Sequence, residues 1–203
     1  MAWTPKLSIT ALLFAVTMSV NALRLDLAPS SAQAQIPGTI TLSLIASDLA
    51  DQIVSSYDIA ISYDPFLTAL GLQFGAVLGG PADSLSGSDL SVLGSVTLFE
   101  VSLLGDDDLQ ALQGDSVTLA TLTFAAASPG ISSLQFDAVL MTGAADPGHP
   151  TTPSILDPTL GGARIEVVPG VVPEPGSLAL LLAALFASTP VLRRRRGLSL
   201  PIR

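Results

Sequence analysis

Cysteine is absent from this 203-residue chain, and histidine occurs once. Without cysteine there is no disulfide framework, no thiolate zinc site and no cysteine nucleophile. The single His149, between Gly148 and Pro150, excludes a His-based catalytic triad and a multi-histidine metal site within the chain, and its setting is typical of a solvated loop residue. The stability of the fold must therefore come from its hydrophobic core.

Basic residues are scarce away from the two ends. Lys6 is the only lysine, and Arg24 and Arg164 are the only arginines between residues 23 and 168. The same span holds sixteen aspartates and glutamates, which gives it a formal charge of −14, against −9 for the whole chain. Nucleic acids and anionic membrane surfaces are bound through basic patches, so nucleic acid is excluded as a partner. Divalent cations, basic protein surfaces and neutral glycans remain possible binding partners.

The N-terminus has the features of a secretory signal peptide over residues 1–22. Lys6 supplies the positive charge, residues 7–20 the apolar region, and Val20-Asn21-Ala22 the small residues of a cleavage site. A second Ala-x-Ala sequence, Ala32-Gln33-Ala34, lies some fourteen residues past the apolar region, and cleavage there would remove a predicted strand. Cleavage after Ala22 is therefore predicted. The alternative is an uncleaved anchor, which the short and interrupted apolar run disfavours.

The C-terminal end has three parts. The sequence Val172-Pro173-Glu174-Pro175 precedes an apolar run from Leu178 to Leu192, and four arginines follow, Arg193, Arg194, Arg195 and Arg196. The run of fifteen residues, extended to about 176–192, is predicted to form a transmembrane helix. It is short compared with the roughly 20 residues that are needed to span a bilayer. Arginines are costly to move across a membrane, so they and a tail of residues 198–203 are expected to stay cytoplasmic.

These parts give residues 172–197 a close resemblance to the PEP-CTERM protein-sorting signal of exopolysaccharide-producing Gram-negative bacteria. The Pro-Glu-Pro triplet, the short apolar helix and the arginine cluster have the order and spacing of that signal. The resemblance implies that a membrane enzyme, an exosortase, recognises the triplet and removes the tail. It also implies an inner-membrane-anchored intermediate that is then sorted to the cell surface or extracellular matrix. The alternative is an ordinary anchor that is never processed.

Residues 23–168, followed by a linker at 169–171, are predicted to form an all-β domain. Apolar residues recur at period two in five segments, which indicates strands buried on one face. These segments are Leu23/Leu25/Leu27, Ile40/Leu42/Leu44, Tyr57/Ile59/Ile61/Tyr63, Leu134/Phe136/Ala138/Leu140 and Ile165/Val167. Clusters of Gly, Pro, Asp and Ser between them are typical of turns.

Two further stretches refine this prediction. Ser95 to Leu104 is apolar on both faces in places, which is typical of an inner strand of a sandwich. The apolar phase shifts between Leu119 and Leu122, which predicts a bulge or a turn between two short strands. About nine short strands fit an antiparallel two-sheet β-sandwich or jelly roll.

Three motifs follow one another in the order found in the cohesin family, which this domain resembles. Residues 37–42 are similar to its early Gly-Asp-x-Val-x-Val strand, residues 57–65 to its strand and turn ending in Tyr-Asp-Pro, and residues 119–124 to its Ala-containing strand ending in Phe. Thr39 departs from the usual Asp, and residues 142–162 are expected to form a long loop. The resemblance implies a nine-stranded jelly roll that binds protein partners, the calcium-loaded dockerin modules of cellulose-degrading assemblies.

Two other functions remain open. Related carbohydrate-binding modules share the sandwich, so exopolysaccharide binding is an alternative, although Trp3 leaves with the signal peptide and few aromatic residues remain for sugar stacking. A polysaccharide-degrading enzyme would need two carboxylates in a cleft about 5–10 Å apart, and the domain is small for such a cleft. The predicted function is therefore that of an exported, non-catalytic binding or structural module.

The acidic residues offer few candidate sites. Asp106, Asp107 and Asp108 form one dense cluster, and three oxygen donors in a loop suit Ca²⁺. The cluster lacks the alternate spacing and closing Glu of an EF-hand, so a solvated loop is the simpler interpretation, and no other cofactor is predicted. Asp58 and Asp64 flank the strand that carries both tyrosines, and Asp64 is predicted to form a turn with the following proline.

Overall fold

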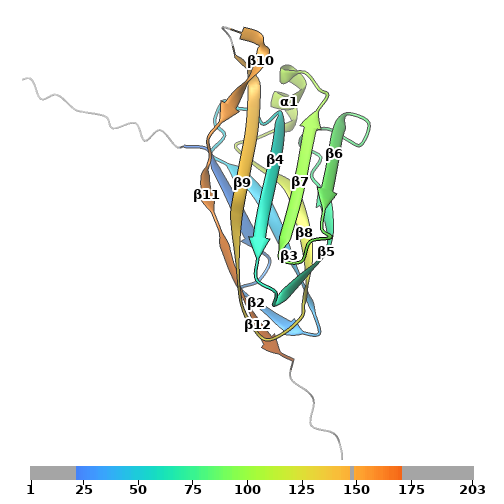
Figure 1. The fold of residues 1–203 in the computed structure, drawn as a ribbon. Helices are drawn as coiled ribbons and strands as arrows, with labels where there is room; N and C mark the ends of the chain where they lie inside the picture. The colour runs from blue at the N-terminus through green and yellow to red at the C-terminus, as the bar shows by residue number, and fades with distance from the viewer. Residues whose placement is uncertain (1–21, 147–148, 171–203) are drawn as a thin grey trace, which may run out of the picture. The chain divides into compact units, whose positions relative to one another are not determined.

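The computed structural model describes residues 22–146 and 149–170, which form twelve strands and one short helix (Figure 1). The strands are β1 (Arg24–Pro29), β2 (Gln33–Ile36), β3 (Thr39–Ser47), β4 (Ser56–Tyr63), β5 (Leu67–Phe74), β6 (Ser84–Asp89), β7 (Ser95–Ser102), β8 (Ser116–Ala126), β9 (Gly130–Asp146), β10 (His149–Leu156), β11 (Thr159–Gly161) and β12 (Ala163–Pro169). The helix α1 spans Asp106–Leu112. The predicted sorting motif and arginine cluster lie outside the described residues.

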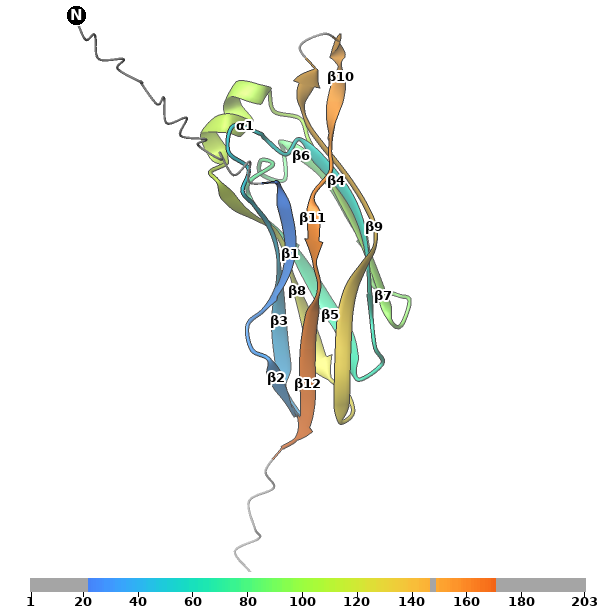
Figure 2. The same cartoon turned by 90° about the vertical axis from the view of Figure 1, so that its left-hand side faces the viewer.

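The strands form two sheets that face each other, and Figure 2 shows them as two layers. One sheet has the order β11-β1-β3-β8-β5, and the other has the order β2-β12-β9-β4-β7-β6, with β10 paired to β9. We call them the five-stranded and the seven-stranded sheet. The pairs β1–β3, β3–β8 and β5–β8 of the five-stranded sheet run antiparallel, as do β12–β9, β9–β4, β4–β7, β7–β6 and β10–β9 of the seven-stranded sheet, whereas β1 and β11 form a short parallel pair. The predicted all-β, two-sheet sandwich is confirmed.

The core lies between the sheets and contains the residues that alternate along the strands. Leu42 and Leu44 of β3 and Ile59 and Ile61 of β4 have no exposed surface. Side chains point alternately to the two faces of a strand, so every second residue reaches the same core. Each such aliphatic side chain contributes about 1.5–3 kcal/mol when it is fully buried.

Twelve strands replace the nine expected because the first and last strands are each broken and because β10 forms in the segment that was expected to be a loop. β1 belongs to the five-stranded sheet and β2 to the seven-stranded sheet, and β11 and β12 divide in the same way. Proline has no N–H to donate, which suits the end of β1 at Pro29. Gly162 separates β11 from β12 where a Cβ would lie 2.7 Å from the Leu134 carbonyl oxygen, so glycine permits this close approach.

The prediction of a long loop over residues 142–162 is wrong. β9 continues to Asp146, and β10 returns beside it with Leu156 opposite Met141. This hairpin extends past the rest of the sandwich, at the end where α1 lies (Figure 1, Figure 2). β10 pairs on one side with β9 and its register shifts around Pro153, and an edge strand tolerates proline in this way.

Two local details complete the fold. The predicted irregularity in residues 117–124 is a bulge inside the continuous strand β8, where the register with β3 shifts between Leu44 and Ile45. The helix α1 was not expected, since its seven residues bury only Leu109 and leave no helical period to detect. Within the described part of the chain, no helix is long and apolar enough to cross a membrane. The predicted span at 176–192 falls outside that part.

Candidate functional site

Large apolar side chains gather on the outer surface of the seven-stranded sheet. Residues paired across antiparallel strands share a face, and Leu85 pairs with Val101, while Asp58 pairs with both Phe99 and Leu140. The exposed fractions are 62% for Leu85, 39% for Phe99, 41% for Val101 and 54% for Leu140. We call these four residues the outer apolar face. A solvated sheet surface is normally polar, so exposed apolar residues at one place mark an interaction surface.

A glycine lies beside the aromatic residue of the outer apolar face, where β6 meets β7. Gly87 pairs with Phe99, and a Cβ at Gly87 would lie 2.6 Å from the Phe99 ring. The ring therefore lies over the glycine, which is how an aromatic residue covers a strand glycine. Asp58 is the charged residue between Phe99 and Leu140, and it is exposed. The surface thus combines exposed apolar side chains with one carboxylate.

The outer surface of the five-stranded sheet has a different composition. Its two central strands, β3 and β8, present mainly hydroxyl side chains to solvent, namely Thr39, Thr41, Ser43, Thr118, Thr121 and Thr123. Two large apolar residues are exposed on the edge strands of this sheet, Leu70 of β5 at 58% and Leu160 of β11 at 48%. The two outer surfaces therefore differ in chemistry, and the apolar one is formed by β6, β7, β4 and β9.

A buried carboxylate lies on the opposite side of β7. Glu100 points into the sandwich and is 1% exposed. Its Oε2 accepts a hydrogen bond from the Tyr57 hydroxyl at 2.9 Å, and its Oε1 accepts one from the Ser84 hydroxyl at 2.9 Å. Burial raises the pKa of Glu100, and these two hydrogen bonds oppose the rise. Burial also raises the pKa of Tyr57, with a further contribution from the charge of Glu100.

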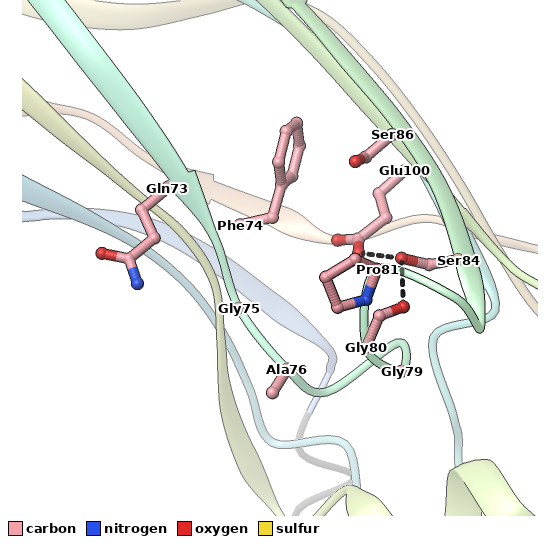
Figure 3. A pocket seen from close by; sticks show the side chains of 10 residues that line it. All are labelled: Gln73, Phe74, Gly75, Ala76, Gly79, Gly80, Pro81, Ser84, Ser86 and Glu100. Atoms are coloured by element: carbon pink, nitrogen blue, oxygen red, sulfur yellow. Dashed lines mark hydrogen bonds between the residues drawn. The ribbon is translucent and has the colours of Figure 1, made fainter.

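Glu100 lines a cavity of about 350 Å³ between β5 and β6 (Figure 3). Its other lining residues include Phe74, Ala76, Pro81, Ser84 and Ser86. Ser86 pairs with Glu100 across the two strands, so both point to the inner side of the sheet. The inner side of β6 thus carries serines where β4 carries isoleucines, and this end of the sandwich interior is polar.

The sequence-predicted acidic cluster forms the first turn of α1. Asp106, Asp107 and Asp108 are all exposed, and the Asp106 Oδ2 accepts a hydrogen bond from the Ala145 N–H at 3.3 Å. Consecutive helical residues point about 100° apart, so the three carboxylates diverge. Among the described residues, no three Asp, Glu or His side chains are placed to hold a metal ion. Acidic residues at this position interact favourably with the helix dipole.

The predicted turn at Asp64 is confirmed. Asp64 Oδ2 accepts a hydrogen bond from the Ser133 N–H at 2.9 Å, and the Asp64 carbonyl accepts one from the Leu67 N–H at 3.2 Å. Tyr63 is buried and packs edge-on against Phe124, with ring centroids 5.1 Å apart. These residues have a structural role in the turn and the core. Ala22, the predicted cleavage residue, is exposed and is the first residue described.

Sequence reasoning missed the outer apolar face. It interpreted the apolar residues on both faces of Ser95 to Leu104 as the sign of an inner strand of a sandwich and did not single out Phe99 and Val101, which are exposed to solvent. β7 is an inner strand within its sheet, between β4 and β6, so that part of the prediction is confirmed. The available signal was that the strand has apolar residues on both faces, Val96 and Leu98 on one and Phe99 and Val101 on the other. It does not tell a covered face from a free one.

No family model matches the sequence, and no curated protein matches it either. Solved structures do match. The seventh ScaB type I cohesin of Pseudobacteroides cellulosolvens has a TM-score of 0.58 at 15% identity, over 74% of this chain and 96% of that one. A chain of a type I cohesin–dockerin complex from Clostridium thermocellum has a TM-score of 0.56 at 17% identity, over 73% and 100%. The domain has a cohesin-like fold.

A type II cohesin from the cellulosome of Acetivibrio cellulolyticus is similar to the same degree. Its TM-score is 0.56 at 14% identity, and the match covers 71% of this chain and 95% of that one. The cohesin-like domain, residues 23–168, therefore has the architecture of complete cohesin modules. At these identities the likeness describes the fold, and the function has to be argued from the site.

Proposed function

We propose that the cohesin-like domain is a non-catalytic module that binds a protein partner through the outer apolar face. The observation that supports this proposal is the group formed by Leu85, Phe99, Val101 and Leu140, exposed together on one face of the seven-stranded sheet. Aromatic and aliphatic residues in the centre of a protein interface contribute most of its binding energy. No covalent chemistry is needed for this function.

The partner that suits this surface has an apolar centre and basic residues around it. The cohesin-like domain carries a formal charge of −14, and Asp58 lies within the outer apolar face. Complementary charge would speed association and orient the partner. Two of the similar structures, from Clostridium thermocellum and Acetivibrio cellulolyticus, are cohesin–dockerin complexes. The partner that we propose for this domain is therefore a dockerin-like protein.

We further propose that the protein is exported and sorted to the cell surface or extracellular matrix of a Gram-negative bacterium. The support is the order of segments in the sequence, with signal-peptide features in residues 1–22 and the PEP-CTERM-like features in residues 172–197. An exosortase would then act on an intermediate anchored in the inner membrane. This proposal concerns the location of the domain and is independent of its partner.

The partner proposal can be tested with residues 23–170, which contain both sheets and form a compact unit up to Val168. The immobilised domain is exposed to a protein with duplicated Ca²⁺-binding loops from the same genome, with and without chelator. Leu140→Asp should weaken capture by roughly thirtyfold or more, because it places a second charge beside Asp58 within the proposed interface.

Leu70→Asp is the matched control, since Leu70 is 58% exposed on the opposite sheet and Leu140 is 54% exposed. It should leave capture within about threefold of the unmodified domain, a change typical of residues outside an interface. Equal effects of the two substitutions would exclude the outer apolar face as the binding surface. A partner that still binds in chelator would not be of the calcium-loaded type.

Binding of the producer's exopolysaccharide is the competing function. The observation that favours it is the hydroxyl-rich outer surface of β3 and β8. Against it, both tyrosines of the chain are buried, so neither is free to stack on a sugar ring. Exopolysaccharide binding that survives Leu140→Asp, together with no protein capture, would favour this alternative.

A further inference from the structure

We propose that the cavity between β5 and β6 binds a primary ammonium group carried on a slender alkyl stem, the chemistry of a lysine side chain or a free alkyl diamine. The ammonium would meet Glu100 and Ser84, and the stem would lie against Phe74 and Pro81. This site faces the interior of the sandwich, on the other side of the sheet from the outer apolar face. The inference does not rest on the partner proposed above.

The first argument is the environment of the Glu100 carboxylate. It is 1% exposed and its two oxygens each accept one hydrogen bond, both from neutral hydroxyl groups. A carboxylate has about four acceptor sites, so its hydrogen-bonding capacity is only partly used. A buried ionised carboxylate is costly unless a positive charge is paired with it. None of the residues that line the cavity is basic.

The second argument is that the domain cannot supply this charge itself. It contains no lysine, and its two arginines lie on other strands, Arg24 on β1 and Arg164 on β12. Arg24 is already paired with Asp26. A cation for Glu100 therefore has to come from outside the cohesin-like domain, and the strongly negative domain attracts cations.

The third argument concerns the kind of cation. Ca²⁺ requires six to eight oxygen ligands, usually with several carboxylates, and Glu100 is the single carboxylate among the cavity's lining residues. The walls are largely apolar, with Phe74, Ala76 and Pro81. A cation on an alkyl stem suits both the single carboxylate and the apolar walls, because it buries its methylene groups against the walls and presents its charge at the end.

The size of the cavity agrees with this ligand. About 350 Å³ is at the lower end of the range of small-molecule sites, which suits one side chain or a short amine. Figure 3 shows Glu100 and Ser84 together at one side of the cavity and Phe74 at another. The arrangement distinguishes a charged end from an apolar wall.

The test uses the cohesin-like domain, residues 23–170, and follows backbone amide shifts by NMR. The probes are Nα-acetyl-lysine N-methylamide and pentane-1,5-diamine, and Nα-acetyl-norleucine N-methylamide is the control with the same stem and no ammonium. We expect millimolar lysine analogue or diamine to shift amides of Ala76, Ser84 and Ser86. Tighter binding of the lysine analogue assigns the site to a side chain, and tighter binding of the diamine assigns it to a free amine.

Glu100→Gln should weaken amine binding by roughly tenfold to a hundredfold, the worth of a charge-assisted hydrogen bond. Ala76→Trp provides a second variant that fills the cavity from an exposed position and leaves the core untouched. Asp107→Asn removes the same charge on α1 and should leave the affinity unchanged. The proposal is overturned if the norleucine analogue binds equally well, if neither amine shifts these amides, or if Asp107→Asn weakens binding as much as Glu100→Gln.

Discussion

Replacing Tyr57 by phenylalanine would remove one hydroxyl from the core and leave the ring in place. That hydroxyl is 2.9 Å from the Glu100 Oε2 and 3.2 Å from the Leu119 carbonyl oxygen. The Leu119 carbonyl keeps a hydrogen bond from the Gly75 N–H at 2.7 Å, so the loss falls on the buried carboxylate. A hydrogen bond to a charged group contributes about 2 kcal/mol, which in a domain of this size corresponds to a fall of roughly 4–8 °C in Tm.

The cost of Tyr57→Phe should depend on pH. Burial raises the pKa of Glu100 in the folded domain, so its protonated form is favoured by folding, and this contribution is lost as the pH rises through the folded pKa. The Tyr57 hydroxyl stabilises the ionised form, and its removal raises that pKa further. Urea unfolding should therefore show a larger deficit in the free energy of unfolding at about pH 8 than at about pH 4, where an unfolded Glu is half protonated.

The second tyrosine is the control. The Tyr63 hydroxyl accepts a hydrogen bond from the Ala69 N–H at 3.4 Å, a long and weak contact, and the residue is buried like Tyr57, with 6% of its surface exposed against 1%. Tyr63→Phe should cost less than about 1 kcal/mol, the net value of a neutral hydrogen bond, and the cost should not change with pH. The reasoning is refuted if Tyr63→Phe costs as much as Tyr57→Phe, or if the Tyr57→Phe deficit is the same at both pH values.

Two further outcomes are expected. The Gln113 side chain accepts a hydrogen bond from the Val54 N–H at 2.8 Å and donates one to the Val54 carbonyl at 2.7 Å. Gln113→Ala should therefore lower the free energy of unfolding, measured in urea, by about 2–3 kcal/mol. As the control, Gln73→Ala at an exposed position should change it by less than about 0.5 kcal/mol. Mass spectrometry of the mature protein should find Leu23 at the N-terminus and no residues 193–196, and a mature chain that retains those arginines would contradict the sorting proposal.

The sandwich could be predicted because each strand repeats one simple pattern. Ile59 and Ile61 reach the core for the same reason that Leu42 and Leu44 do, and period two records this directly in the sequence. The bulge near Leu119 was also visible, because a bulge shifts that period by one residue. Local alternation therefore predicts strands, their buried faces and their irregularities.

Features that depend on distant parts of the chain could not be predicted. The two hydroxyls on Glu100 come from Tyr57 and Ser84, 43 and 16 residues away along the chain, and no local pattern relates the three. The exposure of Phe99 depends on whether another layer covers its sheet, which one strand does not record. The β9–β10 hairpin was missed because residues 142–162 are rich in proline and glycine, which suggested a loop, although an edge strand accommodates Pro153.

The distribution of the two arginines affects how long such a domain would last outside the cell. Trypsin-like proteases cut after lysine or arginine, and the cohesin-like domain offers them Arg24, in β1, and Arg164, in β12. Both are held in strands near the ends of the domain, and cleavage requires local unfolding there. The long interval between them contains no such bond, so the core strands of both sheets would stay in one piece after cutting. The composition that makes the domain acidic also protects it from a whole class of secreted protease.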